Sequence, residues 1–269
     1  MSDGRLVLAS GPARLSVSPA DGGRFSSLVV DGHELLVTEG YGPIRWGCYP
    51  MVPFAGRIRE GRFTFRGRAV ELPRNLPPHA IHGTVFERPW VVLSTSDRAL
   101  RLGIDLGPDW PFPGRVEQAI ELRDDGLTSS LTVTAEAPMP VVVGWHPWFR
   151  WTVGGADASL SFQPGRMVER GDDGLPTGQL VEPKPRPWDD AFVEVVAPPR
   201  MTWPGVIAVE LEADVSHWVV YDESSDGLCV EPQTGPPDAV NQPDLGGAAV
   251  VEPGQPFMRT MTWRWSSPG

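Results

Sequence analysis

Hydrophobic and polar positions alternate along much of the chain, and a period of two residues predicts β-strands rather than helices. The clearest case is the segment 115–134, in which Asp125-Gly126 separates two alternating runs. One face of this predicted hairpin carries Val116, Gln118, Ile120, Leu122, Leu127, Ser129, Leu131 and Val133. A short turn between two alternating runs is typical of an antiparallel hairpin.

Further extended runs follow one another with turn residues between them. Asp31-Gly32 and Arg66-Gly67 each separate two short runs and predict two more tight hairpin turns. The other predicted strands are 5–10, 14–18, 25–30, 34–37, 63–65, 69–72, 90–95, 99–106, 141–143, 160–162, 192–196, 206–211, 218–221, 249–251 and 257–265. We find no amphipathic helix of about ten residues or more, so the pattern predicts an all-β sandwich or barrel.

The domain organisation follows from the same pattern. No internal repeat of fixed period is visible, which argues against a propeller. The proline-rich stretches 72–78 and 181–187 are short and lie between predicted strands, so neither is a linker. We therefore expect one domain over residues 1–269.

Composition excludes several classes of function. The formal net charge of −11 argues against a nucleic-acid or anionic-membrane surface. No segment reaches the roughly 18 apolar residues of a membrane span, and the apolar run near Met1 is too short for a signal peptide. Cys48 and Cys229 have no disulfide or metal-site spacing, and Lys184 is the single lysine, which argues against Schiff-base catalysis. We expect a cytoplasmic protein whose ligand is a small molecule.

An isolated carboxylate lies in the proline-stiffened segment VEPQTGPPDAVN, residues 230–241. Glu231 follows an apolar run and precedes Pro232, and the prolines rule out a helix and limit further strand. We therefore place Glu231 at a strand end, next to a rigid polar loop that begins with Gln233. A carboxylate fixed in this way suits a general base, and an ordinary turn with a solvated glutamate is the alternative.

Two histidines lie in constrained segments rich in tryptophan. His82 precedes Gly83 in IHGTVFERPW, so backbone can approach closely beside the imidazole. His146 ends an apolar run in GWHPWF, where Pro147 predicts an exit from regular structure and Trp148 adds an apolar wall. Such a wall can tune the pKa of a histidine toward neutrality, which suits a general acid. A turn-capping loop histidine and a satisfied core histidine are the alternatives.

Charged residues in two other segments could contact a polar ligand. Arg57 follows Gly56 in a tight turn, and its fork of donors could hold a hydroxyl or a carboxylate. Asp189 and Asp190 follow a proline-rich loop, and one of them, pointing into a cleft, could bind two adjacent sugar hydroxyls. A surface arginine and an ordinary acidic turn are the alternatives.

The ordered segments PFAGRIREGRF, IHGTVFERPW, GWHPWF, DDAF and VEPQTGPPDAVN resemble the motifs of the aldose 1-epimerases, the galactose mutarotase family. The resemblance covers nearly the whole chain. It implies a large antiparallel β-sandwich, the galactose mutarotase-like supersandwich, and a site without metal or other cofactor. The implied activity is interconversion of the α- and β-anomers of a free aldose. We expect a monomer or a homodimer.

The resemblance also implies roles for individual residues. Glu231 falls on the general base, His146 on the general acid and His82 on the first site histidine, while Arg57 and Asp189 fall on substrate-binding positions. Asp190, Gln233 and Trp148 are further candidate contacts to the sugar. The chain departs from the family pattern at Gly56, at Thr84 and at Trp148, where Asn, Gly and Tyr are usual. These departures spare the acid and the base and leave the identity of the sugar open.

The nearest rival is a hexose-6-phosphate 1-epimerase of the same fold. It needs a basic pocket, for which Arg59, Arg74 and Arg88 are candidates, and the net acidity of the chain argues against it. A carbohydrate-binding protein without turnover is a rival of a different class, because it would need neither an acid nor a base.

The sequence gives less support to two hydrolase hypotheses than to the epimerase hypothesis. A zinc hydrolase could use His82, His146 and Glu231, but no HExxH or paired-ligand spacing supports it. A retaining glycosidase could pair Glu231 with Asp189, which leaves His146 without a role.

Overall fold

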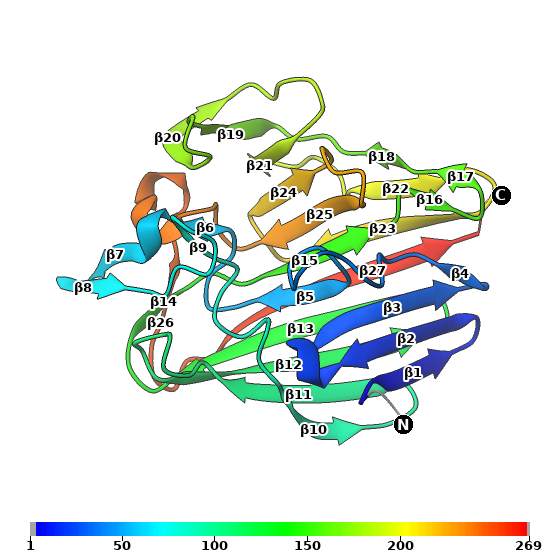
Figure 1. Cartoon of the computed structure of the whole chain (residues 1–269), viewed down its shortest axis with the longest axis horizontal. Helices are drawn as coiled ribbons and strands as arrows, with labels where there is room; N and C mark the ends of the chain where they lie inside the picture. Colours follow the sequence, from blue (N-terminus) through cyan, green and yellow to red (C-terminus); the bar gives the residue numbers. More distant parts are fainter. Residues whose placement is uncertain (1–3, 268–269) are drawn as a thin grey trace.

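The computed structural model describes residues 4–267 and confirms the all-β prediction (Figure 1). Within this range the helical segments are four 3₁₀ turns: η1 (Pro19–Asp21), η2 (Arg59–Gly61), η3 (Ala239–Asn241) and η4 (Pro243–Leu245). None of the helices in the described part of the chain is long and apolar enough to cross a membrane. Met1 to Asp3, part of the stretch considered for a signal peptide, lie outside the described residues.

The larger of the two main sheets has eleven strands. Ten follow one another in the spatial order β1 (Leu6–Ser10), β2 (Ala13–Ser18), β3 (Arg24–Val30), β5 (Cys48–Met51), β15 (Gly144–Phe149), β25 (Leu228–Gln233), β24 (His217–Tyr221), β21 (Asp189–Val193), β19 (Arg166–Arg170) and β20 (Pro176–Val181). The eleventh strand, β4 (His33–Glu34), pairs with β3.

The smaller main sheet has eight strands. Their spatial order is β10 (Val91–Thr95), β11 (Ala99–Asp105), β12 (Gly114–Arg123), β13 (Gly126–Ala135), β27 (Phe257–Ser266), β23 (Ile207–Ala213), β22 (Arg200–Trp203) and β18 (Ser159–Ser161). Two-stranded ribbons pair β14 (Met139–Val141) with β26 (Ala249–Val251), β16 (Thr152–Val153) with β17 (Ala156–Asp157), β6 (Arg57–Ile58) with β9 (Ala80–Ile81), and β7 (Arg62–Phe65) with β8 (Arg68–Glu71).

The two main sheets pack face to face, and their inner faces form the core (Figure 1). The Trp145 indole of β15 donates to Ser129 Oγ of β13 at 3.1 Å. Phe149, also on β15, packs on Trp263 of β27 with ring centroids 4.9 Å apart. Because side chains alternate across a strand, His146 and Trp148 of β15 face the opposite way, away from the smaller sheet.

The predicted hairpin is confirmed as β12 and β13, with its turn displaced by one residue. Arg123 pairs with Gly126, so Asp124-Asp125 forms the turn rather than Asp125-Gly126. Gly126 is the first residue of β13, and the strand needs glycine there because a Cβ would lie 2.5 Å from the Trp263 carbonyl oxygen. The turns at Asp31-Gly32 and Arg66-Gly67 are confirmed, and all four residues have positive φ.

The predicted strand ends at His146 and Glu231 are wrong. β15 continues through Pro147 to Phe149, and β25 continues through Pro232 to Gln233. The two strands pair at both ends of their contact, from Gly144 to Gln233 and from Trp148 to Cys229, with no pairing between. The two prolines lack the N–H groups that a ladder would use there, so they interrupt the pairing without ending the strands.

Several strands of the larger sheet have no counterpart among the predicted runs. β5, β19 and β20 lie in segments without clear alternation, and β21 begins at Asp189 rather than at residue 192. The residues of β5, β15 and β25 are buried on both faces of the sheet, so period-two alternation is lost there. These doubly buried strands form the floor of the site described next.

Candidate active site

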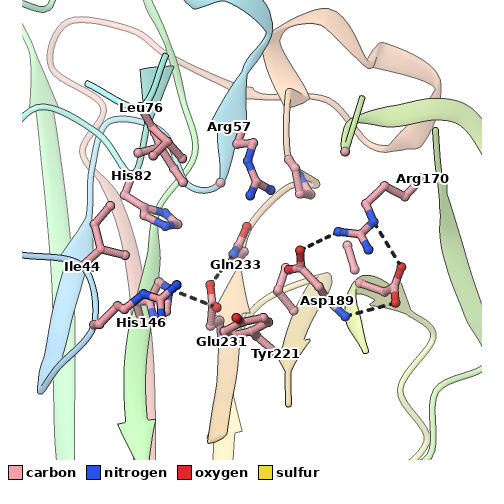
Figure 2. A pocket seen from close by; sticks show the side chains of 18 of the residues that line it. Ile44, Arg57, Leu76, His82, His146, Arg170, Asp189, Tyr221, Glu231 and Gln233 are labelled. Carbon is pink, nitrogen blue, oxygen red and sulfur yellow. Dashed lines mark hydrogen bonds and ion pairs between the residues drawn. The ribbon is translucent and has the colours of Figure 1, made fainter. Parts of the chain in front are cut away.

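A cavity of about 490 Å³ opens on the face of the larger sheet that is turned away from the smaller sheet (Figure 2). Its volume falls in the range of small-molecule sites. All the residues that the sequence singled out for the site line it: Arg57, His82, His146, Trp148, Asp189, Asp190, Glu231 and Gln233. The fold therefore brings together side chains that are up to 176 positions apart in the chain.

A histidine and a glutamate from neighbouring strands meet at the bottom of the cavity. His146 Nε2 lies 3.2 Å from Glu231 Oε1, and the two residues are 5% and 3% exposed. The Gln233 side-chain amide donates to Glu231 Oε2 at 3.0 Å and fixes the carboxyl plane. We call His146 and Glu231 the acid–base pair, and Figure 2 shows their contact as a dashed line.

The environment of the acid–base pair favours its uncharged form. Burial raises the pKa of Glu231 well above its ordinary value, and the negative charge of Asp189 raises it further. Burial also lowers the pKa of His146 to about 3, and the positive charge of Arg24 acts in the same direction. Both shifts favour the neutral form of each group, a protonated carboxyl beside an unprotonated imidazole.

Aromatic rings fix the orientation of the His146 imidazole. The ring stacks between Tyr49, at a centroid distance of 4.9 Å, and Trp148, at 5.7 Å. The His82 ring meets it edge-on at 4.9 Å and 89°. Such packing leaves the imidazole little freedom to turn, so Nε2 stays directed at Glu231.

His82 is held in the left-handed region of backbone conformation, with a φ of 59°. The next residue, Gly83, has no room for a side chain, because a Cβ would lie 2.0 Å from the Val52 carbonyl oxygen. The close backbone approach predicted from the His-Gly pair is therefore confirmed. Burial and the charges of neighbouring His146 and Arg57 lower the pKa of His82 well below its ordinary value, so its ring is neutral near pH 7.

The Arg57 guanidinium has no ion-pair partner in the described part of the chain. It belongs to β6 and points into the cavity (Figure 2). Among residues 4–267 its side chain has no hydrogen-bond or ion-pair partner. Gly56 before it has a φ of 66°, a conformation that Gly and Asn tolerate best. This conformation accounts for Gly56 at a position where the family usually has Asn.

The two neighbouring aspartates have different surroundings. Asp189 reaches the cavity and pairs with Arg170 Nη1 at 2.5 Å (Figure 2). Asp190 is 3% exposed, pairs with Lys184 Nζ at 2.9 Å, and accepts the Asp189 N–H at 3.2 Å. Asp190 therefore holds the start of β21 in place, and Asp189 is the better candidate to contact a ligand.

Some residues of the site could not be recognised as site residues from the sequence. Arg170 orients Asp189, and Tyr221 meets the Trp148 ring edge-on at 5.9 Å. The segment that contains Tyr41 and Ile44 forms part of the cavity wall. None of these residues lies in one of the five ordered motifs, and only the strand pairing brings them to the site.

The arginines predicted as a phosphate site do not line the cavity. Arg59 pairs with Asp173, and Arg88 donates to the Leu106 carbonyl oxygen at 2.9 Å. Arg59, Arg74 and Arg88 all belong to the described residues, and none is among those that line the cavity. These three arginines, the candidates named for the rival hexose-6-phosphate epimerase, therefore form no phosphate pocket in this cavity.

One group of side chains in the described part of the chain has the composition of a metal site. The ligating atoms of His146, Cys229 and Glu231 lie within 4.8 Å of one another. The zinc-hydrolase hypothesis also used His82, which is not in this group. Burial raises the pKa of both the Cys229 thiol and the Glu231 carboxyl group, so a metal would have to displace two retained protons.

Comparisons with known proteins agree with the fold and with the family that the ordered motifs resemble. The aldose 1-epimerase family matches residues 6–196. The uncharacterized protein YphB of Escherichia coli K12 is 28% identical over 242 residues, which are 81% of this chain and 83% of YphB.

Solved structures resemble the fold. A galactose mutarotase-like protein from Clostridium acetobutylicum superimposes with a TM-score of 0.87 and 17% identity, over 97% of this chain and 95% of the other. A galactose 1-epimerase from Lactobacillus acidophilus gives a TM-score of 0.80 and 16% identity, over 98% and 95% of the two chains.

Proposed function

The chain belongs to the aldose 1-epimerase family, and on that basis we propose that it interconverts the α- and β-anomers of a free aldose. The observation that carries the proposal is the 3.2 Å contact between His146 and Glu231 at the bottom of a buried cavity. Mutarotation needs one group that takes a proton and one that gives a proton. A pair that shares a single proton meets that need without any cofactor.

Ring opening would use the acid–base pair as follows. The shared proton first passes from Glu231 to His146, which leaves the net charge of the pair unchanged. Glu231 then takes the proton of the anomeric hydroxyl while His146 gives its proton to the ring oxygen. The bond between C1 and the ring oxygen breaks, and the aldehyde forms. At this point the proton is again on Glu231.

Ring closure reverses these transfers after rotation about the C1–C2 bond. The chain hydroxyl attacks the other face of the aldehyde carbon, and His146 takes the hydroxyl proton. Glu231 gives its proton to the former aldehyde oxygen, which becomes the anomeric hydroxyl. No proton is gained or lost over the cycle.

The other residues of the cavity would bind and orient the sugar. The positive charge of Arg57 lowers the pKa of Glu231, so it supports the carboxylate form that takes the anomeric proton. The neutral His82 ring can donate to or accept from a sugar oxygen. Asp189, oriented by Arg170, suits a pair of adjacent hydroxyls, and Trp148 offers apolar surface.

Neutral aldoses suit the cavity better than sugar phosphates. Of the arginines that line it, Arg45 pairs with Asp226 at 3.2 Å and Arg170 pairs with Asp189. Within residues 4–267, Arg57 is the one of these arginines without an ion-pair partner, and its charge acts on Glu231. A phosphate dianion there would compete with the carboxylate that serves as base.

Polarimetry of freshly dissolved sugars tests the proposal. We expect the protein to accelerate the mutarotation of α-glucose or α-galactose, and to act more slowly on glucose 6-phosphate. A faster rate on the phosphate would overturn the preference for neutral sugars, and acceleration of none would remove the proposed activity. The single-domain organisation, the monomeric or homodimeric state and the cytoplasmic location stay predictions from the sequence.

A further inference from the structure

A buried arginine without a carboxylate partner lies behind the active site. Arg24 of β3 is 1% exposed, and no acidic side chain of the described residues forms an ion pair with it. Its guanidinium instead donates to the carbonyl oxygens of Trp46 at 2.5 Å and Pro43 at 2.6 Å. Burial lowers its pKa to about 10, and it stays charged near pH 7. A buried charge of this kind is costly to keep, which calls for a reason.

A stack of rings connects Arg24 to the acid–base pair. The guanidinium carbon lies 4.6 Å from the centre of the Tyr49 ring, and that ring stacks on His146 at 4.9 Å. Tyr49 and His146 are also opposite each other in the pairing of β5 with β15. The fixed positive charge is therefore separated from the imidazole by one aromatic ring.

Arg24 also holds one wall of the cavity. Pro43 belongs to the segment 41–45, which lines the cavity, and Trp46 follows it directly. The Trp46 ring lies over the guanidinium at 4.2 Å. At Gly47 a Cβ would lie 2.9 Å from the Arg24 side chain, so the segment fits closely around it.

We propose that Arg24 is a positioning residue for the epimerase site: it keeps His146 uncharged through the Tyr49 ring, and it holds the cavity wall 41–46 through two carbonyl groups. A second proton on the acid–base pair would leave no group able to take the anomeric proton. A positive charge behind Tyr49 opposes that second proton. The catalytic part of this inference rests on the proposed function, whereas the effect on His146 does not.

The other groups that face His146 do not provide the same effect. From β25 come Glu231 and Cys229, from β5 comes Tyr49, and from the residue after β9 comes His82. Arg57 of β6 lines the same cavity. Burial favours the neutral form of the carboxyl, the Cys229 thiol, the phenol and His82. Burial lowers the pKa of His146 most, and the charge of Arg24, rather than that of Arg57, lowers it further.

Three variants separate the two roles. Arg24→Met removes the charge and the donors but keeps an apolar side chain, a kind of replacement that buried charges often tolerate. Arg24→Lys keeps a charge with fewer directed donors. Arg150→Met is the matched control, because Arg150 also donates to a backbone carbonyl, that of Leu36 at 2.8 Å, without contacting Tyr49 or His146.

The readout is the pH titration of the His146 ring by NMR on histidine-labelled protein, assigned with His146→Asn. In Arg24→Met the ring should begin to take up its proton about one pH unit higher than in the wild type, as expected for loss of a unit charge at roughly 9 Å in a medium of effective dielectric about 20. Arg24→Lys and Arg150→Met should titrate as the wild type does. The acid limb of the activity profile should shift only in Arg24→Met, while KM should rise in both Arg24 variants.

An Arg24→Met protein whose His146 titrates like the wild type would overturn the inference, and so would an equal shift in Arg150→Met. If Arg24→Met does not fold, Arg24→Gln, which can still donate to one carbonyl, makes the same comparison. A wild-type protein that accelerates no mutarotation would remove the proposed function and leave the NMR result to decide the link between Arg24 and His146.

Discussion

Replacing Glu231 by Gln removes the proposed base and changes little else. Oε2 of Glu231 accepts from the Gln233 amide at 3.0 Å, and the carbonyl oxygen of a glutamine can accept the same bond. Its NH₂ group can donate to His146 Nε2 across the 3.2 Å contact. Because burial raises the pKa of Glu231 and so favours the uncharged carboxyl, the neutral amide suits the same surroundings.

The expected loss of rate follows from the missing proton transfer. A positioned acid or base contributes about 10²–10⁴-fold, which corresponds to roughly 2.7–5.5 kcal/mol of barrier. Glu231→Gln should lose that factor in kcat while its KM stays within a few-fold of the wild type. Its melting temperature at pH 7 should be unchanged, because shape, hydrogen bonding and charge are kept.

The assay combines initial rates of mutarotation with sugar binding followed by tryptophan fluorescence and with thermal unfolding. Gln233→Glu is not a suitable control, because it adds a carboxylate beside the first. Thr84→Ser is suitable, since its hydroxyl donates to the Leu106 carbonyl oxygen and does not line the cavity. Near-normal turnover in Glu231→Gln would show that Glu231 is not the base, because an amide cannot take the anomeric proton.

Three further outcomes are expected. Arg57→Ala should raise KM by about 10- to 100-fold, the value of one charge-assisted hydrogen bond. Its stability should be unchanged, because no group of the described residues loses an ion-pair partner. Fluorescence titration of sugar binding checks this, and unaltered binding would contradict it. Folding lowers the pKa of three histidines, His82, His146 and His217, that of His217 to about 4. The unfolded chain therefore binds more protons than the folded protein below pH 6.5, so stability should fall as pH decreases from about 6.5 to 4. Equal urea midpoints at pH 7 and 4.5 would contradict this. Activity should survive dialysis against a chelator and be the same in Cys229→Ser; loss that zinc restores would favour a metal centre.

The parts of the fold that could be predicted from the sequence are those fixed by interactions between residues close together in the chain. The hairpin of β12 and β13 follows from local alternation and a local turn, and its buried face was predicted residue by residue. The error of one residue at its turn arose because Gly126 is required by a distant strand, β27, rather than by the turn.

The candidate site likewise contains residues with a local sequence signal and residues without one. His146 and Glu231 stand out in the sequence because prolines flank them, although the prolines interrupt a strand pairing rather than end the strands. Arg170 and Arg24 carry no local signal, because each acts on a residue that only the folded sheet brings near. Arg59, in contrast, lies in a motif and yet pairs outside the cavity.

The activity proposed for this cavity is the exchange of sugar anomers. The most direct test is NMR saturation transfer between the α- and β-anomeric protons of glucose or galactose at equilibrium, with a catalytic amount of protein. We expect transfer that grows in proportion to protein concentration and is lost in His146→Asn. Transfer no faster than in buffer for every aldose tested, from a folded protein that still binds the sugar, would remove the proposed activity and leave a carbohydrate-binding protein.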